Sequence, residues 1–265
     1  FNINIYKGLY MDTEIHTIPC LRDNYAYIIH NHKRNETFLI DAPESFPIIK
    51  KIEEKNWKLN KIVFTHHHSD HTMGTNDLVK KFKPVLVGSE TDSHRLPKLG
   101  EKLKVNEILH LGNLRFEIID VPGHTIGHLA FYCNELDALF TGDSLMAFGC
   151  GRLFEGTPAM MWKTLSKFKN LPLDTKIYSG HEYAIKNLEF ALSIDSENKD
   201  LQKKYVQIKD LIYRNLPSVP STIRDELKIN PFLRANTIEI KTALNMIKDT
   251  NENVFAELRR RRDSF

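Results

Sequence analysis

Three of the four imidazoles and the carboxylate of the heptapeptide T-H-H-H-S-D-H, which starts at Thr65, have the spacing H-x-H-x-D-H. A short apolar run typical of a buried strand comes directly before it. Side chains two residues apart on a strand project to the same side, so His66 and His68 can bind one metal ion. The turn that follows offers Asp70 and His71 to a second ion. Two adjacent metal ions indicate hydrolytic chemistry.

Three further metal-capable side chains follow a glycine at the end of a strand-like run. The run 116–119 leads to His124, and Asp143 and His181 each come directly after a glycine that ends a similar run. Folds of the α/β class gather their sites where strands meet loops, at the carboxyl ends of the strands. A histidine run alone would equally suit a solvated loop. The recurrence of the pattern favours a metal centre.

The four segments together resemble the metallo-β-lactamase superfamily: T-H-H-H-S-D-H, P-G-H-T-x-G-H, F-T-G-D-S-L and S-G-H-E-Y. More narrowly, the chain resembles the glyoxalase II (hydroxyacylglutathione hydrolase) family. That resemblance rests on L-R-D-N-Y-A-Y from Leu21, G-C-G-R-L-F-E-G from Gly149, N-P-F-L-R from Asn230 and R-R-R-R-D from Arg259. These segments span nearly the whole chain in the order of the family.

The resemblance implies a binuclear metal site with seven ligands. It assigns His66, His68 and His124 to the first metal, Asp70, His71 and His181 to the second, and Asp143 to both. Two divalent ions are implied, and zinc is expected first. Iron and manganese are the alternatives, because a nitrogen and oxygen ligand set suits all three metals.

The implied reaction is the hydrolysis of S-D-lactoylglutathione, or of other S-2-hydroxyacylglutathiones, to glutathione and the hydroxy acid, as in methylglyoxal detoxification. Metal coordination lowers the pKa of water from about 15.7 to about 7, so a bridging hydroxide would be the nucleophile. Asp70 would also orient this hydroxide. No serine or cysteine nucleophile is required.

Glutathione carries two carboxylates, which arginine binds well. The resemblance places five residues at the glutathione moiety: Arg152, Phe154, Tyr183, Arg259 and Arg262. Arg152 stands where the family pattern has lysine and Phe154 where it has tyrosine, changes that concern affinity more than reaction type. Taken alone, the arginine run would instead predict a solvated basic tail.

The remaining histidines and the cysteines have simpler expected roles. His67 should project away from its ligand neighbours and pack or support them, and His128 should support a ligand without binding metal. The other histidines are expected to be ordinary surface or core residues: His16, His30, His32, His94 and His110. Three cysteines without paired spacing favour a reducing compartment, and Cys150 is expected to pack rather than react.

Two domains are expected. Strands alternate with helices over residues 1–182, which suits the four-layer αββα sandwich implied by the resemblance. An amphipathic helix is predicted at Met160–Phe168. Beyond Ala184, leucines and isoleucines recur at helical spacing, so residues 183–265 are predicted to be a small all-α glutathione-binding domain with a further helix near Thr222–Leu227.

Composition limits the partners. The net charge of +3 is scattered over 265 residues, which disfavours nucleic acid, and no apolar run approaches a membrane span. We therefore expect a soluble monomer that binds a small glutathione thioester. Phe1–Tyr10 precede Met11, where cytosolic members of the family begin, and we interpret them as a leader remnant or an artificial addition. The cytoplasm is expected, with a mitochondrion or plastid as the alternative.

The same residues disfavour four other functions. A persulfide dioxygenase of this scaffold would bind a single iron and lack the helical extension. A diiron oxygen reductase would have a carboxylate in place of a ligand histidine, and a nuclease would need added nucleic-acid-binding segments. A catalytically inactive binding module would be expected to lose a ligand, and none is lost.

Overall fold

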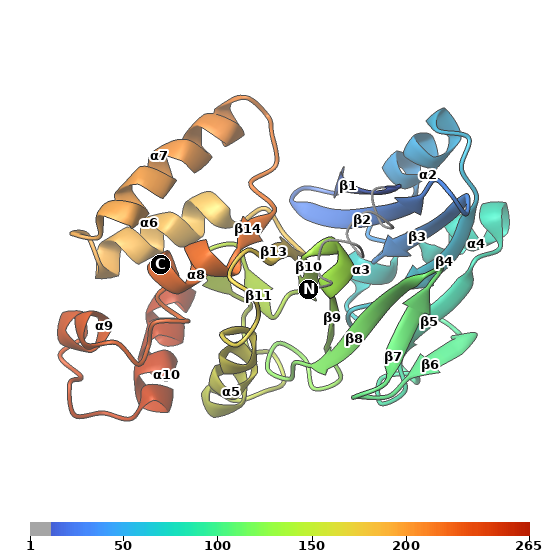
Figure 1. The fold of residues 1–265 in the computed structure, drawn as a ribbon. Coiled ribbons are helices and arrows are strands. Elements are labelled where there is room, and N and C mark those ends of the chain that lie inside the picture. The colour runs from blue at the N-terminus through green and yellow to red at the C-terminus, as the bar shows by residue number, and fades with distance from the viewer. Residues whose placement is uncertain (1–11) are drawn as a thin grey trace, which may run out of the picture. The chain divides into compact units, whose positions relative to one another are not determined.

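The computed structural model describes residues 12–265, so the interpretation of Phe1–Tyr10 lies outside the described residues. The described chain forms two compact units, whose elements are drawn in Figure 1. The first unit comprises residues 12–120 and Gly127–Phe140, and the second comprises Val121–Ile126 and Thr141–Phe265. The chain therefore leaves the first unit for only six residues, 121–126, before it returns.

The first unit contains a six-stranded mixed sheet in the order β1-β2-β3-β4-β5-β6. Its antiparallel part is β1 (Thr13–Cys20), β2 (Asn24–Asn31) and β3 (Glu36–Ile40), and its parallel part continues with β4 (Leu59–Val63), β5 (Val85–Ser89) and β6 (Glu101–Leu103). Helix α2 (Ser45–Glu54) connects β3 to β4, and α3 (Ser69–Thr72) and α4 (Thr75–Phe82) connect β4 to β5.

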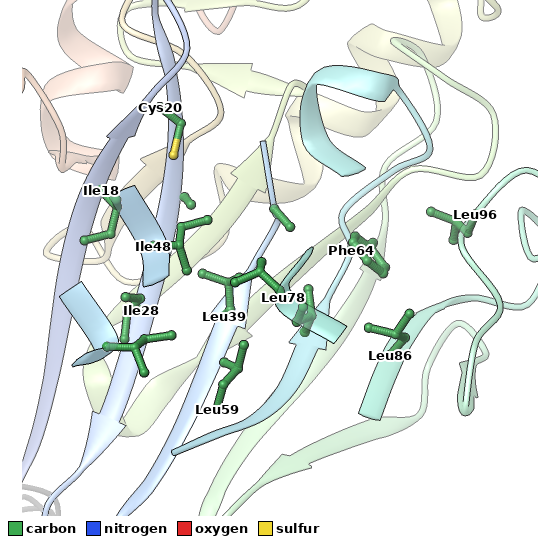
Figure 2. Close-up of a cluster of buried hydrophobic side chains, with 14 residues drawn as sticks. Ile18, Cys20, Ile28, Leu39, Ile48, Leu59, Phe64, Leu78, Leu86 and Leu96 are labelled. Atoms are coloured by element: carbon green, nitrogen blue, oxygen red, sulfur yellow. The ribbon is translucent and has the colours of Figure 1, made fainter. Parts of the chain in front are cut away.

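Buried aliphatic side chains fill the space between this sheet and its helices. Figure 2 shows Ile28 of β2, Leu39 of β3 and Ile48 of α2 in one cluster, to which Leu78 of α4 also belongs. Helix α2 buries Ile48 and Ile52, which are four residues apart and therefore share one face. Burying each such side chain stabilises the fold by roughly 1.5–3 kcal/mol. This core holds the ends of β3 and β4 in place.

The first unit also contains strands of a second sheet, in the order β10-β9-β8-β7. These strands are β7 (Ile108–Leu111), β8 (Leu114–Asp120), β9 (Leu129–Cys133) and β10 (Ala138–Gly142), and a short 3-10 helix, η2 (Asn134–Leu136), joins the last two. The ring of Phe140 in β10 packs edge-on against Tyr27 in β2 at 5.5 Å. The two sheets therefore face each other within this unit, as expected of the sandwich.

The second unit carries the remaining strands and a helix predicted from the sequence. Strand β13 (Lys176–Ser179) pairs with β14 (Ser221–Thr222), and β11 (Leu145–Met146) pairs with β12 (Gly149–Cys150) in a hairpin. Helix α5 (Pro158–Phe168) confirms the helix predicted at Met160–Phe168. It begins where the Thr157 side chain accepts a hydrogen bond from the Met160 N–H, which is a common N-cap arrangement.

The rest of the second unit is helical, as predicted. Its helices are α6 (Ala184–Ile194), α7 (Lys199–Tyr213), α8 (Ile223–Ile229), α9 (Ile238–Ala243) and α10 (Asn251–Asp263). The helix predicted near Thr222 begins one residue later, because the Thr222 side chain caps it. The two-residue strand β14 was not expected, since it has no apolar run to signal it.

Within residues 12–265, no helix has the combination of length and apolar composition that crossing a membrane needs. The domain boundary expected after residue 182 stays a prediction. Helix α10 packs against α5, which belongs to the same compact unit although it precedes that boundary.

Candidate metal centre and substrate pocket

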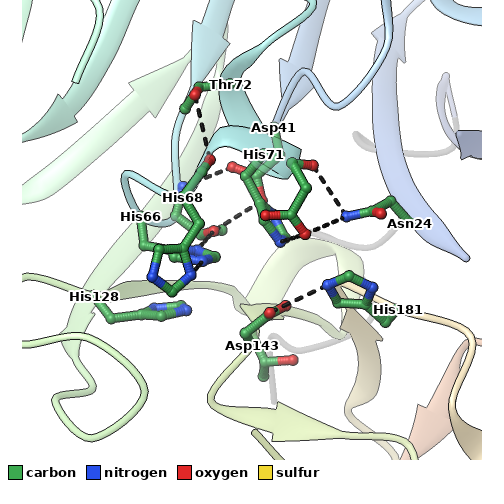
Figure 3. A network of polar contacts seen from close by, with 12 residues as sticks. Asn24, Asp41, His66, His68, His71, Thr72, His128, Asp143 and His181 are labelled. Atoms are coloured by element: carbon green, nitrogen blue, oxygen red, sulfur yellow. Dashed lines mark hydrogen bonds and ion pairs between the residues drawn. The ribbon is translucent and has the colours of Figure 1, made fainter. Parts of the chain in front are cut away.

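Four of the predicted ligands lie just beyond the end of β4. The His66 Nε2 and His68 Nδ1 atoms are 3.1 Å apart, and the rings of His66 and His71 have centroids 4.2 Å apart. The Asp70 carboxylate lies 3.7 Å from His71 Nε2. Figure 3 shows these histidines gathered at the loop that follows the strand. The predicted strand-to-turn placement of the cluster is therefore present in the first unit.

Asp41, at the end of β3, orients this cluster. Its buried carboxylate accepts hydrogen bonds from Thr65 N and Thr65 Oγ1, both at 2.8 Å, and lies 2.8 Å from His71 Nδ1. An ionised carboxylate only accepts, so His71 carries its proton on Nδ1 and keeps the Nε2 lone pair. Metal-binding histidines are commonly held in this way.

The same carboxylate sets the tautomer of His66 through Thr65. The Thr65 hydroxyl gives its single hydrogen to Asp41, so it can only accept from His66 Nδ1, which lies 3.0 Å away. The His66 Nε2 atom then keeps its lone pair, like that of His71. One buried acid thus prepares two histidines of this cluster as metal ligands.

Three further side chains contact this cluster: His67 and His128, for which a supporting role was expected, and Asn24, for which none was. His67 turns away from its neighbours and contacts Asp92 at 3.1 Å, and Asp92 also accepts from Arg95. The buried His128 ring stacks on His66, with centroids 4.6 Å apart. Asn24 donates from Nδ2 to the Asp70 carbonyl and to Asp70 Oδ2, both at 3.0 Å.

The second unit holds the other three predicted ligands in a cluster of its own. The Asp143 Oδ2 atom lies 3.2 Å from His181 Nε2, the contact dashed in Figure 3, and 3.4 Å from His124 Nε2. All three side chains are buried. His124 Nδ1 donates to the Arg152 carbonyl at 2.8 Å, because a carbonyl can only accept, and its Nε2 lone pair therefore faces the carboxylate.

The donor set of the two clusters suits metal ions. Two acceptors such as His124 Nε2 and Asp143 Oδ2 cannot hydrogen-bond to each other, and a shared cation would satisfy both. Among residues 12–265, the side chains found in groups able to hold a metal ion are the seven predicted ones: His66, His68, Asp70, His71, His124, Asp143 and His181. Five imidazoles and two carboxylates match zinc, iron or manganese.

Three of the predicted substrate residues are at least partly exposed in the second unit. Arg152 is exposed, with its Nε 3.4 Å from Asp263 Oδ1. Phe154 is also exposed and meets the His124 ring edge-on at 5.2 Å. The Tyr183 ring stacks on His181, with centroids 4.8 Å apart. Phe154 and Tyr183 therefore each contact a predicted metal ligand, whereas the Arg152 side chain contacts Asp263.

The terminal arginines differ from one another, and neither belongs to a solvated tail. Arg259 is buried, donating from Nη1 to the Cys150 carbonyl at 2.8 Å and from Nη2 to Asp263 at 2.9 Å. Arg262 is half-buried with Nε and Nη2 3.3 Å from Asn187 Oδ1, and burial lowers the pKa of its guanidinium. Both Nη atoms of Arg259 bind groups of the chain itself. A direct contact of Arg259 with glutathione stays a prediction.

Sequence reasoning missed Asp41, Thr65 and Asp263 as supporting residues. Asp41 comes directly after the apolar strand β3, the same pattern that marked Asp143 and His181. That signal was available. Asp263 ends the family segment that starts at Arg259, but only the fold shows that its carboxylate joins Arg152 to Arg259.

Gly151 offers a test of how tightly the second cluster is packed. A Cβ at this position would lie 1.9 Å from the Asp143 carbonyl oxygen, which is backbone and cannot move aside cheaply. We expect Gly151→Ala to lower the free energy of unfolding by about 1–3 kcal/mol, measured by thermal unfolding. In the control Gly100→Ala, the new Cβ meets the Val85 side chain at 3.1 Å, and the loss should be smaller. Equal melting temperatures for both variants would contradict this packing argument.

Comparison with known proteins agrees with the geometry. Residues 21–181 match the family model of the metallo-beta-lactamase superfamily, and residues 182–265 match the model of the hydroxyacylglutathione hydrolase C-terminus. A hydroxyacylglutathione hydrolase of Roseobacter denitrificans is 46% identical over 96% of this chain and 100% of its own length. The chain belongs to the hydroxyacylglutathione hydrolase family. This confirms the family predicted from the sequence motifs.

Other relatives support the family and the fold. A hydroxyacylglutathione hydrolase of Mesorhizobium japonicum is 41% identical over 96% of this chain and all of its own length. The crystal structure of the BLEG-1 B3 metallo-beta-lactamase has a TM-score of 0.65 at 20% identity, covering 83% of this chain and 99% of that one. ETHE1 from Myxococcus xanthus has a TM-score of 0.64 at 19% identity, covering 95% and 99%. The predicted fold class, a metallo-β-lactamase sandwich followed by helices, is confirmed.

Proposed function

We propose that this protein hydrolyses the thioester of S-2-hydroxyacylglutathiones, with S-D-lactoylglutathione as the expected substrate. The observation that carries the proposal is the full-length identity of 46% to a protein named hydroxyacylglutathione hydrolase. The presence of all seven metal-capable side chains in groups able to hold an ion supports it. In the reaction, a water oxygen adds to the thioester carbonyl carbon, the carbon–sulfur bond breaks, and glutathione leaves as its thiolate.

Two divalent metal ions, zinc in the first instance, are proposed as the cofactors. His66, His68 and His124 would hold one, Asp70, His71 and His181 the other, and Asp143 both. When bound, the ions supply a hydroxide at neutral pH and a Lewis acid for the carbonyl oxygen. Support comes from the Nε2 lone pairs that Asp41, Thr65 and the Arg152 carbonyl leave on three of the histidines.

The protein's own residues orient the attacking water and the substrate. Asp70, which Asn24 holds through Oδ2, would also accept a hydrogen bond from the attacking water. Arg152 and Arg262 would bind the glutathione carboxylates, and Arg259 would support this pocket through Asp263. Phe154 and Tyr183 would cover the bound tripeptide. A thiolate is a tolerable leaving group, so no strong general acid is needed.

The proposal is tested by following the loss of thioester absorbance of S-D-lactoylglutathione with metal-replete protein. We expect turnover that stops when a chelator removes the metal and returns when zinc, iron or manganese is added. Comparing the three metals identifies the one that supports activity best. Absence of hydrolysis by fully metallated protein would exclude the proposed reaction, and oxygen consumption with glutathione persulfide would then be measured.

The glutathione pocket makes a prediction about KM. Replacing Arg262 with alanine should raise KM for S-D-lactoylglutathione about tenfold and change kcat little, because a charged hydrogen bond to a carboxylate is lost away from the thioester. The neighbouring Arg261→Ala is the matched control, since Arg261 donates to Glu257 at 2.8 Å. An unchanged KM in the Arg262 variant would place the carboxylate contact elsewhere.

We also propose that the protein is a cytoplasmic monomer whose partner is this small substrate. Support comes from the scattered charge and the three buried free cysteines, which suit a reducing compartment. A mitochondrion or plastid remains the alternative compartment. Light scattering coupled to size exclusion tests the monomer, and a dimer mass would contradict it.

A further inference from the structure

Residues 147–150, which comprise the loop between β11 and β12 together with β12 and are here called the 147–150 turn, are held by side chains from the helical part of the second unit. Each residue of the turn offers one backbone group to a side chain. The pairs are Asn187 Nδ2 to the Ala147 carbonyl at 3.0 Å, the Phe148 N–H to Glu226 at 3.0 Å, Asn230 Nδ2 to the Gly149 carbonyl at 3.0 Å, and Arg259 Nη1 to the Cys150 carbonyl at 2.8 Å. These side chains come from α6, from α8 and its C-cap, and from α10.

In the sequence, the 147–150 turn lies between a predicted metal ligand, Asp143, and a predicted substrate residue, Arg152. Gly151 donates its N–H to the Ser144 carbonyl at 3.2 Å, and the Arg152 carbonyl accepts from His124. A displacement of the turn would therefore reach Arg152 through a single intervening residue, Gly151. The helices thus act on the pocket through backbone contacts as well as through their own arginines.

Among the side chains that hold the turn, Glu226 is the carboxylate. It is fully buried and accepts from Phe148 N with both oxygens, at 3.0 and 3.1 Å. It also accepts from Ser221 Oγ at 2.6 Å and from Asn230 Nδ2 at 2.8 Å. Phe148 has a φ of 61°, a left-handed conformation that costs a non-glycine residue about 1 kcal/mol or more. The carboxylate fixes the N–H of that strained residue.

We propose that Glu226 is a positioning residue for the glutathione end of the substrate, acting through the 147–150 turn on Arg152. This rests on the proposed function, because it assumes that Arg152 binds glutathione. Glu226 touches no predicted metal ligand and does not take part in the chemical step. Its role is to fix the geometry of the 147–150 turn, because the ionised carboxylate accepts hydrogen bonds from that turn with both oxygens.

The chemistry of these contacts makes the loop sensitive to pH. Burial raises the pKa of Glu226 to about 7, although the bonds from Ser221, Phe148 and Asn230 act in the opposite direction. Protonation of Glu226 places a hydrogen on one of its carboxyl oxygens, where that hydrogen faces an N–H donor. Of the surrounding donors, only the Ser221 hydroxyl can rotate to accept a hydrogen bond from the protonated acid. The charge of Asp225 on the same helix raises the pKa of Glu226 further. The groups that donate hydrogen bonds to Glu226, from Ser221, Phe148 and Asn230, are neutral.

Substrate affinity should therefore be highest above pH 7 and weaken as Glu226 takes up its proton. The folding stability changes with pH in the opposite direction. The folded-state pKa is raised, so the free energy of unfolding contributed by this group falls as pH rises from about 4.5 to about 7 and is constant above that. The two opposite trends separate a positioning role from a general effect on folding.

The test uses metal-replete protein and S-hexylglutathione, which has a thioether in place of the thioester and is not hydrolysed. Its Kd is measured by calorimetry between pH 6 and 8.5 for the wild type, Glu226→Gln and Asp225→Asn. Glutamine imitates the protonated acid, so we expect the Glu226 variant to bind about three- to tenfold more weakly at pH 8 and to show no pH dependence through 7. The Asp225 variant, which loses its ion pair with Lys204, should bind as tightly as the wild type at pH 8. Its pH midpoint should move downward, because the Asp225 charge raises the pKa of Glu226.

A second variant keeps the test decisive if Glu226→Gln folds poorly. Ser221→Ala removes one acceptor bond of Glu226, so the midpoint of the pH dependence of Kd should move upward. A Glu226 variant that folds, keeps its metal and binds S-hexylglutathione within twofold of the wild type at all pH values would overturn the positioning role. Failure of the wild type to hydrolyse S-D-lactoylglutathione would instead contradict the proposed function, so the two failures are distinguishable.

Discussion

Replacing Asp143 with asparagine is expected to lower kcat for S-D-lactoylglutathione by more than about a hundredfold and to reduce the metal content of the purified protein. The carboxylate lies 3.4 and 3.2 Å from His124 and His181 and is buried, so its loss removes a negative charge beside one predicted ligand of each metal ion. Loss of an outer residue that merely supports a ligand costs about 10–100-fold, and the loss of a shared ligand should exceed that.

Two measurements on the same preparation check this prediction: the metal content by mass spectrometry, and kcat by steady-state kinetics. Asp174→Asn is the matched control, because Asp174 is an exposed carboxylate of the same unit that pairs with Arg224 at 2.8 Å. The control should keep its metal and its activity. A fully active Asp143 variant with undiminished metal would show that Asp143 does not bridge the ions.

Asp41→Asn should weaken metal binding by about 10–100-fold while the protein remains folded. The substituted amide presents an NH₂ group to Thr65 N–H, Thr65 Oγ1–H or His71 Nδ1–H, all of which donate to the wild-type carboxylate. At least one histidine would then lose the contact that fixes its tautomer. Titration against a chelator of known affinity measures the change.

The control for Asp41 is another buried carboxylate that contacts a histidine. Asp92 lies 3.1 Å from His67, which is not a predicted ligand, and accepts from Arg95 at 2.6 Å. Asp92→Asn should lower the melting temperature without changing metal affinity. If both variants lost metal to the same extent, the loss would reflect general destabilisation rather than the orientation of His66 and His71.

The predicted metal ligands could be found from the sequence because their signals are local. An apolar strand, a turn or glycine, and a histidine or aspartate lie within a few residues, as at Val63–His66 and at Gly142–Asp143. Strand periodicity also separates His67 from its neighbours, and the structure places His67 against Asp92 as expected. Helix α5 was predictable for the same reason, since its buried face repeats within the helix.

Only the tertiary structure decided which distant residues support those signals. Asp41 precedes His71 by thirty residues, and their contact exists because β3 and β4 are parallel neighbours with their ends aligned. Glu226 reaches Phe148 across 78 residues, and Arg259 reaches Cys150 across 109. No periodicity in the sequence encodes such pairs. The chain alone therefore determined the chemistry that its residues could perform, whereas folding decided which buried carboxylates hold those residues in place.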